Sequence, residues 1–228
     1  MTHMVIAREL NKHLQKGIIK DMDLFYLGNL APDSIHAREG YLRIYKKHTH
    51  LRDDIPDKDF GKEENLVLFH ERVTRFILEN RDSWDGLEDL YRGYVVHILT
   101  DELFVLTIRE EFNKTVEKLG IIQGEPIYID YIITDMIRND YLLVKNYEGM
   151  DEIRRQIEGV PIYPIRGYLT EKEMSISRDW MVRQYFYEEN QCLQPRYITY
   201  ERILTFIQLS VENIINRLSE GGSLPRMF

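Results

Sequence analysis

Residues 93–104 read Gly93-Tyr94-Val95-Val96-His97-Ile98-Leu99-Thr100-Asp101-Glu102-Leu103-Phe104. The stretch is mostly apolar, yet it carries His97 and Asp101 four residues apart. On a helix that spacing places both side chains on one face, with Cβ atoms about 5–6 Å apart. Burying an imidazole and a carboxylate is costly unless each group has a partner. The two groups could pair with each other, or both could bind a metal ion, since imidazole and carboxylate are good zinc ligands.

The composition of the chain is that of an ordinary globular protein. Its 228 residues are 43% hydrophobic and 30% charged, with a formal net charge of −8, and we expect one domain over residues 1–228. No apolar run approaches the ~20 residues of a membrane span, and the N-terminus lacks the pattern of a signal peptide. The acidic charge argues against stable nucleic-acid binding. The single Cys192 fits a reducing cytoplasm, where we expect the protein to act.

Apolar spacing predicts an all-α protein. We expect a multi-helix bundle with a metal-site half over about residues 1–120 and a helical C-terminal half over about 125–220. A glycine inside a helix costs about 1 kcal/mol relative to alanine, so Gly93 predicts close approach of another backbone. Thr2 is expected to cap the first helix, Pro32 to disfavour helix at Ala31, and Thr170 with Glu173 to form a capping box. Helices are predicted over 2–16, 63–80, 87–118, 127–144, 151–158, 170–189 and 197–218, a turn over 83–86, irregular chain over 35–60 and a frayed tail over 221–225.

Histidine is confined to the N-terminal half, which predicts that this half assembles a site. All seven histidines lie within the first 97 residues: His3, His13, His36, His48, His50, His70 and His97. The polar groups at the edges of apolar helices are His3, Asp33, His50 and the pair His97 and Asp101, with His48 as an alternative to His50. Three histidines and two aspartates suit zinc or another divalent transition metal, as one or two ions. Two metals ~3.5–4 Å apart form a common device for hydrolysing phosphate esters.

Other acidic residues and histidines have less specific interpretations. Asp33 follows a proline and could simply cap a turn. Asp135 lies three residues before Arg138, and we favour a structural ion pair between them, although Asp130 or Asp135 could also supply a further ligand. His36, just after the Pro-Asp corner, could face a substrate or support the ligands.

Four motifs occur in order along the chain. They are Thr2-His3-x-x-x-Ala7, Gly28-Asn29-x-Ala31-Pro32-Asp33, Lys47-x-x-His50 and Gly93-Tyr94-x-x-His97-x-x-x-Asp101. This ordered set resembles the zinc-dependent phospholipase C family, which shares its all-helical fold with the P1/S1 nucleases. The resemblance covers roughly residues 2–105. It implies that His3, His50 and His97 are metal ligands, that Asp33 is both ligand and catalytic base, and that Asp101 can bridge two ions.

The chain departs from the secreted members of that family. Those members use an N-terminal tryptophan amine as a ligand, and later histidines complete a third zinc site. Here the chain begins with Met1 and has no histidine after His97, so we expect one or two ions.

The resemblance predicts a divergent cytoplasmic hydrolase that cleaves a small phosphoester, as a phosphodiesterase or phospholipase C-like enzyme. A metal-bound hydroxide would be the nucleophile, with Asp33 as the base and Arg38, Lys46, Lys47 or Arg138 holding the phosphate. The alternative is a non-catalytic helical protein with a structural or sensory metal or polar cluster.

Overall fold

The structure is a computed structural model that describes residues 1–81 and 86–228. Residues 82–85, which include most of the turn expected at 83–86, lie outside the described part. As predicted, the described chain is helical, and it contains no strand beyond one isolated bridge between Ile165 and Leu169. The α-helices are α1 (Thr2–His13), α2 (Met22–Leu30), α3 (Arg43–Thr49), α4 (Glu63–Arg81), α5 (Glu88–Phe104), α6 (Glu110–Glu117), α7 (Pro126–Asn146), α8 (Met150–Gly159), α9 (Glu171–Val182) and α10 (Tyr200–Leu218).

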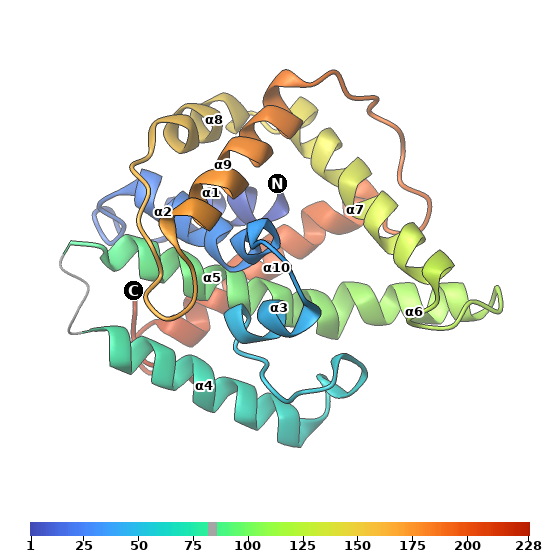
Figure 1. Ribbon diagram of the computed structural model, residues 1–228, viewed down its shortest axis with the longest axis horizontal. Coiled ribbons are helices and arrows are strands. Elements are labelled where there is room, and N and C mark those ends of the chain that lie inside the picture. The colour runs from blue at the N-terminus through green and yellow to red at the C-terminus, as the bar shows by residue number, and fades with distance from the viewer. Residues whose placement is uncertain (82–85) are drawn as a thin grey trace.

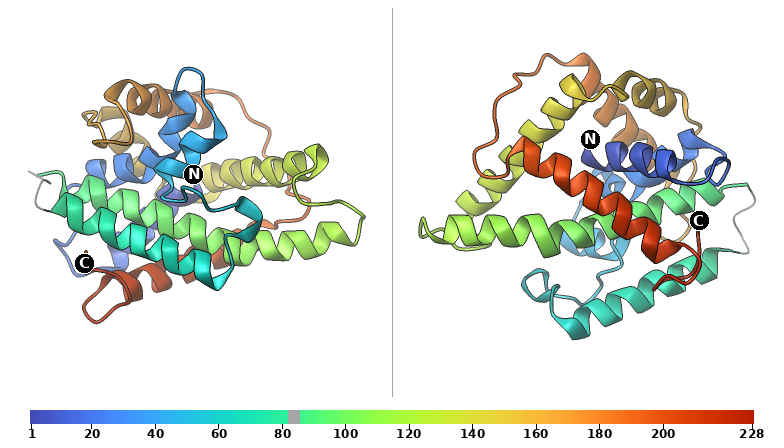
Figure 2. Two further views of the ribbon diagram at one scale, coloured as in Figure 1. Left: turned by 60° about the horizontal axis from the view of Figure 1, so that its bottom comes forward. Right: turned by 180° about the vertical axis from the view of Figure 1, so that it is seen from behind.

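One long helical rod runs through the molecule, as predicted for residues 87–118. It consists of α5, a π-helical turn η3 (Val105–Arg109) and α6 in a straight line (Figure 1). From Gly93 to Thr100 every residue of α5 is buried, which is the pattern of a helix packed on all sides. Helices α1, α2, α4 and α10 all contact α5, and the view from behind shows α1 and α10 covering its far face (Figure 2).

The contact between α2 and α5 depends on two glycines. A Cβ atom on Gly93 would lie 2.1 Å from the Phe25 carbonyl oxygen, and a Cβ on Gly28 would lie 2.0 Å from the Leu90 carbonyl oxygen. Both distances are far inside van der Waals contact, and both neighbours are backbone atoms that cannot rotate away. The close backbone approach predicted from Gly93 is therefore present, and Gly28 is the matching position on α2.

The C-terminal half covers the open side of the N-terminal half. Helix α9 packs on the 3₁₀ segment η1 (Ala31–Ala37), and α10 packs on α1. A second π-helical turn, η4 (Arg183–Tyr187), follows α9 directly and contacts α7. The predicted capping box at the start of α9 is confirmed: the Thr170 hydroxyl accepts from the Glu173 amide, and the Glu173 carboxylate accepts from the Thr170 amide.

Local predictions in the N-terminal half need correction at three places. The Thr2 hydroxyl does not cap α1; both it and the Thr2 amide donate to Asp140 Oδ1 at 3.0 Å, and Met1 is the capping residue. Residues 35–60 contain α3 and a 3₁₀ turn, η2 (Asp57–Asp59). The only fully buried residue of α3 is Thr49, so no apolar stripe announces this helix. Helix α2 ends at Leu30, but Ala31 keeps a helical backbone, so the predicted loss of helix there is wrong. Pro32 is tolerated because it stands in the first turn of η1, where its missing amide costs no hydrogen bond.

The tail predicted to fray is packed instead. Leu224 and Phe228 are buried, and the Leu218 carbonyl accepts hydrogen bonds from the Met227 and Phe228 amides. Arg92 of α5 donates to the Met227 carbonyl at 2.8 Å. Apolar side chains after the Gly-Gly-Ser segment thus fold back against the core.

None of the helices in the described ranges combines the length and the hydropathy that crossing a bilayer requires.

Replacing Gly93 with alanine tests the backbone contact. The new methyl group would overlap the Phe25 carbonyl oxygen, and overpacking of this kind costs about 1–3 kcal/mol or more. We expect Gly93→Ala to lower the free energy of unfolding by at least about 2 kcal/mol in urea denaturation, despite the better helix propensity of alanine. Gly159→Ala is the matched control, because a Cβ there meets nothing within 4 Å; it should leave stability unchanged or raise it. Equal stability of the two variants would contradict the contact.

Candidate metal centre

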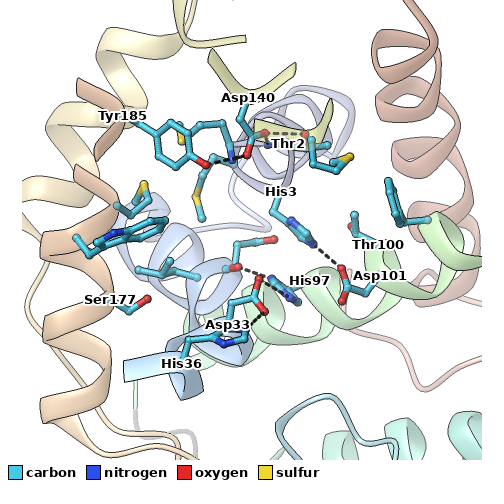
Figure 3. Close-up of a pocket in the computed structure, with 18 of the residues that line it drawn as sticks. Thr2, His3, Asp33, His36, His97, Thr100, Asp101, Asp140, Ser177 and Tyr185 are labelled. Atoms are coloured by element: carbon cyan, nitrogen blue, oxygen red, sulfur yellow. Dashed lines mark hydrogen bonds and ion pairs between the residues drawn. The ribbon is translucent and has the colours of Figure 1, made fainter. Parts of the chain in front are cut away.

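The five predicted ligand residues meet at one place. His3 comes from the first turn of α1, Asp33 from η1, His50 from the residue after α3, and His97 and Asp101 from α5. His3 Nε2 lies 3.1 Å from Asp101 Oδ1, and His50 Nε2 lies 3.3 Å from Asp101 Oδ2. Asp33 is contacted by His50 Nε2 at 3.4 Å and by His97 Nε2 at 3.9 Å. Figure 3 shows His3 turned toward Asp101 and Asp33 turned toward His97.

The backbone fixes the orientation of two imidazoles. His97 Nδ1 lies 2.7 Å from the Asn29 carbonyl oxygen, and His50 Nδ1 lies 2.9 Å from the Lys46 carbonyl oxygen. A carbonyl oxygen only accepts, so each Nδ1 carries the proton, and in a neutral ring Nε2 then presents a lone pair. Metal-binding histidines are oriented in this way by a hydrogen bond from the other ring nitrogen. Both Nε2 atoms are buried and have no hydrogen-bond partner in the described chain.

The charge states place a lone pair of His97 beside an ionised carboxylate. Burial, followed by the charge of His3, lowers the pKa of His97 to about 3, so this ring is neutral at pH 7. Burial raises the pKa of Asp33 and Asp101, but Lys46 beside Asp33 and the imidazoles beside Asp101 outweigh it and hold both pKa values well below their usual range. The buried Nε2 of neutral His97 therefore presents a lone pair 3.9 Å from Oδ2 of the ionised Asp33. Such groups repel unless a positive ion lies between them.

The spacing of the donor atoms fits a metal. Zinc binds nitrogen and oxygen at about 2.0–2.2 Å in a tetrahedron, which puts its ligand atoms about 3.3–3.5 Å apart. The measured separations are 3.1, 3.3, 3.4 and 3.9 Å. Two trios have ligand atoms that all lie within 4.8 Å of one another: His3 with His97 and Asp101, and Asp33 with His50 and His97. Asp101 turns one oxygen toward His3 and the other toward His50, as an aspartate bridging two ions would.

Of the two alternative ligands, His48 and His50, the cluster contains His50. His50 is buried at the site, whereas His48 is 47% exposed and pairs with Asp53 at 3.0 Å. His36 lies at the edge, with Nε2 3.8 Å from Asp33 Oδ1.

The predicted pair of Asp135 with Arg138 is wrong, and Asp135 has no free oxygen for a metal. Asp135 accepts hydrogen bonds at 2.6–2.9 Å from three backbone amides of the loop before α10, while Arg138 donates to the Gln194 carbonyl. A carboxylate that is used by distant backbone amides leaves no signal in the sequence. Asp130 is exposed on α7, away from the cluster.

Of the four cations proposed for phosphate, only Lys46 reaches the site. Lys46 Nζ lies 2.7 Å from Asp33 Oδ1. Lys47 donates to the Ile55 carbonyl, Arg38 pairs with Glu173, and Arg138 is held at Gln194.

An open cavity of about 710 Å³ adjoins the cluster and is lined by His3, Asp33, His97 and Asp101. Sequence reasoning missed its other side, which comes from the C-terminal half. Asp140 of α7 and Tyr185 of η4 lie across the cavity from His97 and are joined at 3.2 Å (Figure 3). In the sequence, this wall is indicated by the spacing of Met136 and Asp140, which are four residues apart and so share one face of a helix. Further lining residues that the sequence did not single out are Arg109, Met136, Ile176, Trp180, Met181 and Phe206.

Comparison with known proteins adds no relative: no family model, curated protein or solved structure matches the chain.

The ligand assignment predicts the metal content of purified protein. We expect about one or two divalent ions per chain in protein prepared without chelator, measured by plasma mass spectrometry. His50→Ala should weaken zinc affinity by at least about 100-fold, because loss of a supporting residue alone costs about 10–100-fold. His48→Ala is the matched control and should leave affinity unchanged. Little bound metal in the wild type, with no further loss in His97→Ala, would rule out the site.

Proposed function

We propose that the protein is a metal-dependent hydrolase acting on a small phosphoester. The observation that carries this proposal is the pair of buried, unpartnered Nε2 atoms on His50 and His97, turned toward two carboxylates beside an open cavity. Structural zinc sites are closed, with all positions filled by protein, whereas catalytic sites leave a position open to substrate. The 710 Å³ cavity therefore favours catalysis over the alternative of a purely structural or sensory cluster.

Each residue of the cluster has a distinct task in this proposal. His3, His50, His97 and Asp101 would hold one or two ions, with Asp33 as a shared ligand. When bound, such ions supply positive charge for the phosphate and acidify a water molecule. The Asp33 side chain is 40% exposed, so it can also accept a proton from a water in the cavity. Lys46 holds Asp33 Oδ1 and leaves Oδ2 facing His97.

The resemblance to the zinc-dependent phospholipase C family supports the same proposal. Its four motifs supply the clustered residues, and Gly28, Asn29 and Gly93 of those motifs have a role in orienting His97. The chain would then be a divergent member with one or two ions. The helical architecture is in line with this assignment.

The opposite wall indicates what kind of ester fits. Trp180 and Ile176 of α9 line the cavity and are still 49% and 45% exposed, and Met136 of α7 and the buried Phe206 of α10 also line it. Exposed large apolar side chains inside a concave polar site mark a surface that a ligand covers. We infer that the phosphate carries an apolar substituent that rests against Trp180.

Hydrolysis of chromogenic esters tests the activity. Protein loaded with zinc or manganese should hydrolyse 4-nitrophenyl phosphate or bis(4-nitrophenyl) phosphate, and chelator should abolish turnover reversibly. Asp33→Asn should lower kcat by at least about 100-fold, since it removes the base. His13→Ala, an exposed histidine outside the cavity, is the control and should be fully active. Fully loaded protein without turnover on either ester would favour a non-catalytic role.

Trp180→Ala tests the apolar wall. Loss of this ring should raise KM for 1-naphthyl phosphate about tenfold, because the naphthyl group would no longer bury the exposed part of the indole, roughly half of its surface. KM for methyl phosphate, which has no group to rest there, should stay the same. Leu209→Ala, an equally exposed residue of α10 outside the cavity, should change neither. A similar rise for both esters would contradict an apolar subsite.

A further inference from the structure

Arg109 reaches the cavity because the central rod changes its winding. On a regular α-helix the residue that follows Phe104 on the same face is Ile108, four positions later. Instead, Ile108 is in the core with 1% of its surface exposed, and Phe104 and Arg109 both line the cavity. The intervening segment is the π-helical turn η3, in which hydrogen bonds join residues five apart. The π turn therefore brings Arg109 onto the cavity side.

A second π turn lies in the opposite wall of the cavity. In η4 the cavity-lining residue is Tyr185, which follows the cavity-lining Trp180 by five positions and the cavity-lining Met181 by four. Figure 3 shows Tyr185 across from Asp33 and His97. Both π turns of the described chain thus present a polar side chain to one cavity. Such turns are rare and occur frequently at functional sites.

Arg109 has no acidic partner. Its side chain makes no hydrogen bond or ion pair with residues 1–81 or 86–228, and its Nε is buried without a partner. Of the two acidic residues that follow it on α6, Glu110 is exposed and is not paired with Arg109, and Glu111 is paired with Arg202 through two contacts of 2.7 Å. Arg217, which is also partly buried, is paired with Glu102 at 2.7 Å, whereas the buried Arg52 has no acidic partner among the described residues and stacks on the Phe60 ring at 3.8 Å. Arg109 differs from Arg52 because it lines the cavity. Burying part of a guanidinium without an anion costs free energy. The unpaired donors of Arg109 therefore indicate that a ligand binds beside it.

We propose that Arg109 is a substrate-binding residue that donates hydrogen bonds to the phosphate oxygens of the ester in this cavity. The guanidinium is a planar fork of five donors that matches a phosphate with two parallel hydrogen bonds. A helical side chain covers the surface on the N-terminal side of its own Cα, which for Arg109 is the side of Phe104 and Asp101. The ester would then be held by an anion-binding group at Arg109, by the metal cluster at Asp101 and by the apolar wall at Trp180. This inference rests on the proposed function for the identity of the ligand.

Binding of phenylphosphonate to the metal-loaded full chain tests the proposal without turnover, because the carbon–phosphorus bond resists hydrolysis. Isothermal titration should give a Kd that rises about 10–100-fold in Arg109→Ala, since a hydrogen bond to a charged group contributes about 1.5–3 kcal/mol. Arg109→Lys keeps the charge but loses the fork, so its Kd should lie between the two. Arg155→Ala makes the same change in net charge at an exposed position of α8 and should bind as the wild type does.

Metal content and thermal unfolding of each variant separate binding from folding. If Arg109→Ala is unstable, Arg109→Lys carries the test, with a several-fold weaker Kd at unchanged metal content. Equal affinity of wild type and Arg109 variants, or no phosphonate binding by fully loaded wild type, overturns the role of Arg109 and leaves the hydrolase proposal to its own assay. Arg109-dependent phosphonate binding with no hydrolysis of any ester overturns the proposed function and retains the anion site.

Discussion

The backbone contact between Gly28 and Gly93 determines where the polar groups of the site lie. With any side chain at either position, α2 and α5 would have to separate, because the new atom would overlap a carbonyl oxygen. The Asn29 carbonyl, next to Gly28, would then move away from His97 Nδ1, which it now contacts at 2.7 Å. The close contact of α2 with α5 therefore sets the orientation of the His97 ring. It also sets the position along α5 of η1, which follows α2 and carries Asp33. A packing constraint on two helices is therefore also a constraint on the chemistry.

The buried polar groups of the site differ from those that only stabilise the fold. Asp135 is buried and satisfied by three backbone amides, and Asp89 is satisfied by the Lys20 and Asp21 amides together with Arg92. Each of these carboxylates meets enough donors to repay its desolvation. The Nε2 atoms of His50 and His97 instead face acceptors, and the Arg109 Nε faces no acceptor. Buried polar atoms outside the cavity, such as Arg52 Nε and the Tyr26 hydroxyl, also lack hydrogen-bond partners within the described chain. The indication of an outside partner therefore comes from the cavity, which His97 and Arg109 both line.

Sequence periodicity was enough to predict the helical architecture and the long central rod, because residues 93–100 are mostly apolar and buried on all sides and residues 110–117 keep an amphipathic helical spacing. Four of the five clustered residues could be collected because they sit at the ends or edges of apolar segments, whereas His50 was included through the motif Lys47-x-x-His50. The short helix α3 escaped prediction because charged residues cover it and only Thr49 is buried. Asp135 was misjudged because its partners lie about 60 positions away and are backbone amides. Arg109 could not be found at all, since a π turn shifts the helical face by one residue without any change in composition.

The C-terminal half shows why a list of ligands does not define a site. Every clustered residue comes from the first 101 positions, yet the other walls of the cavity are formed by α7, α9, η4 and α10. The N-terminal half would leave the carboxylates facing water, where an ion and a phosphate are both well solvated and the electrostatic attraction between them is weak. Helices α7, α9 and α10 supply an apolar wall that lowers the local dielectric and strengthens that attraction. They also supply the second π turn, which contains the cavity-lining Tyr185. The two π turns each sacrifice regular helical hydrogen bonding, and both do so beside the same cavity. Packing alone would not require this coincidence, whereas a site that must present polar groups from two walls to one ligand would.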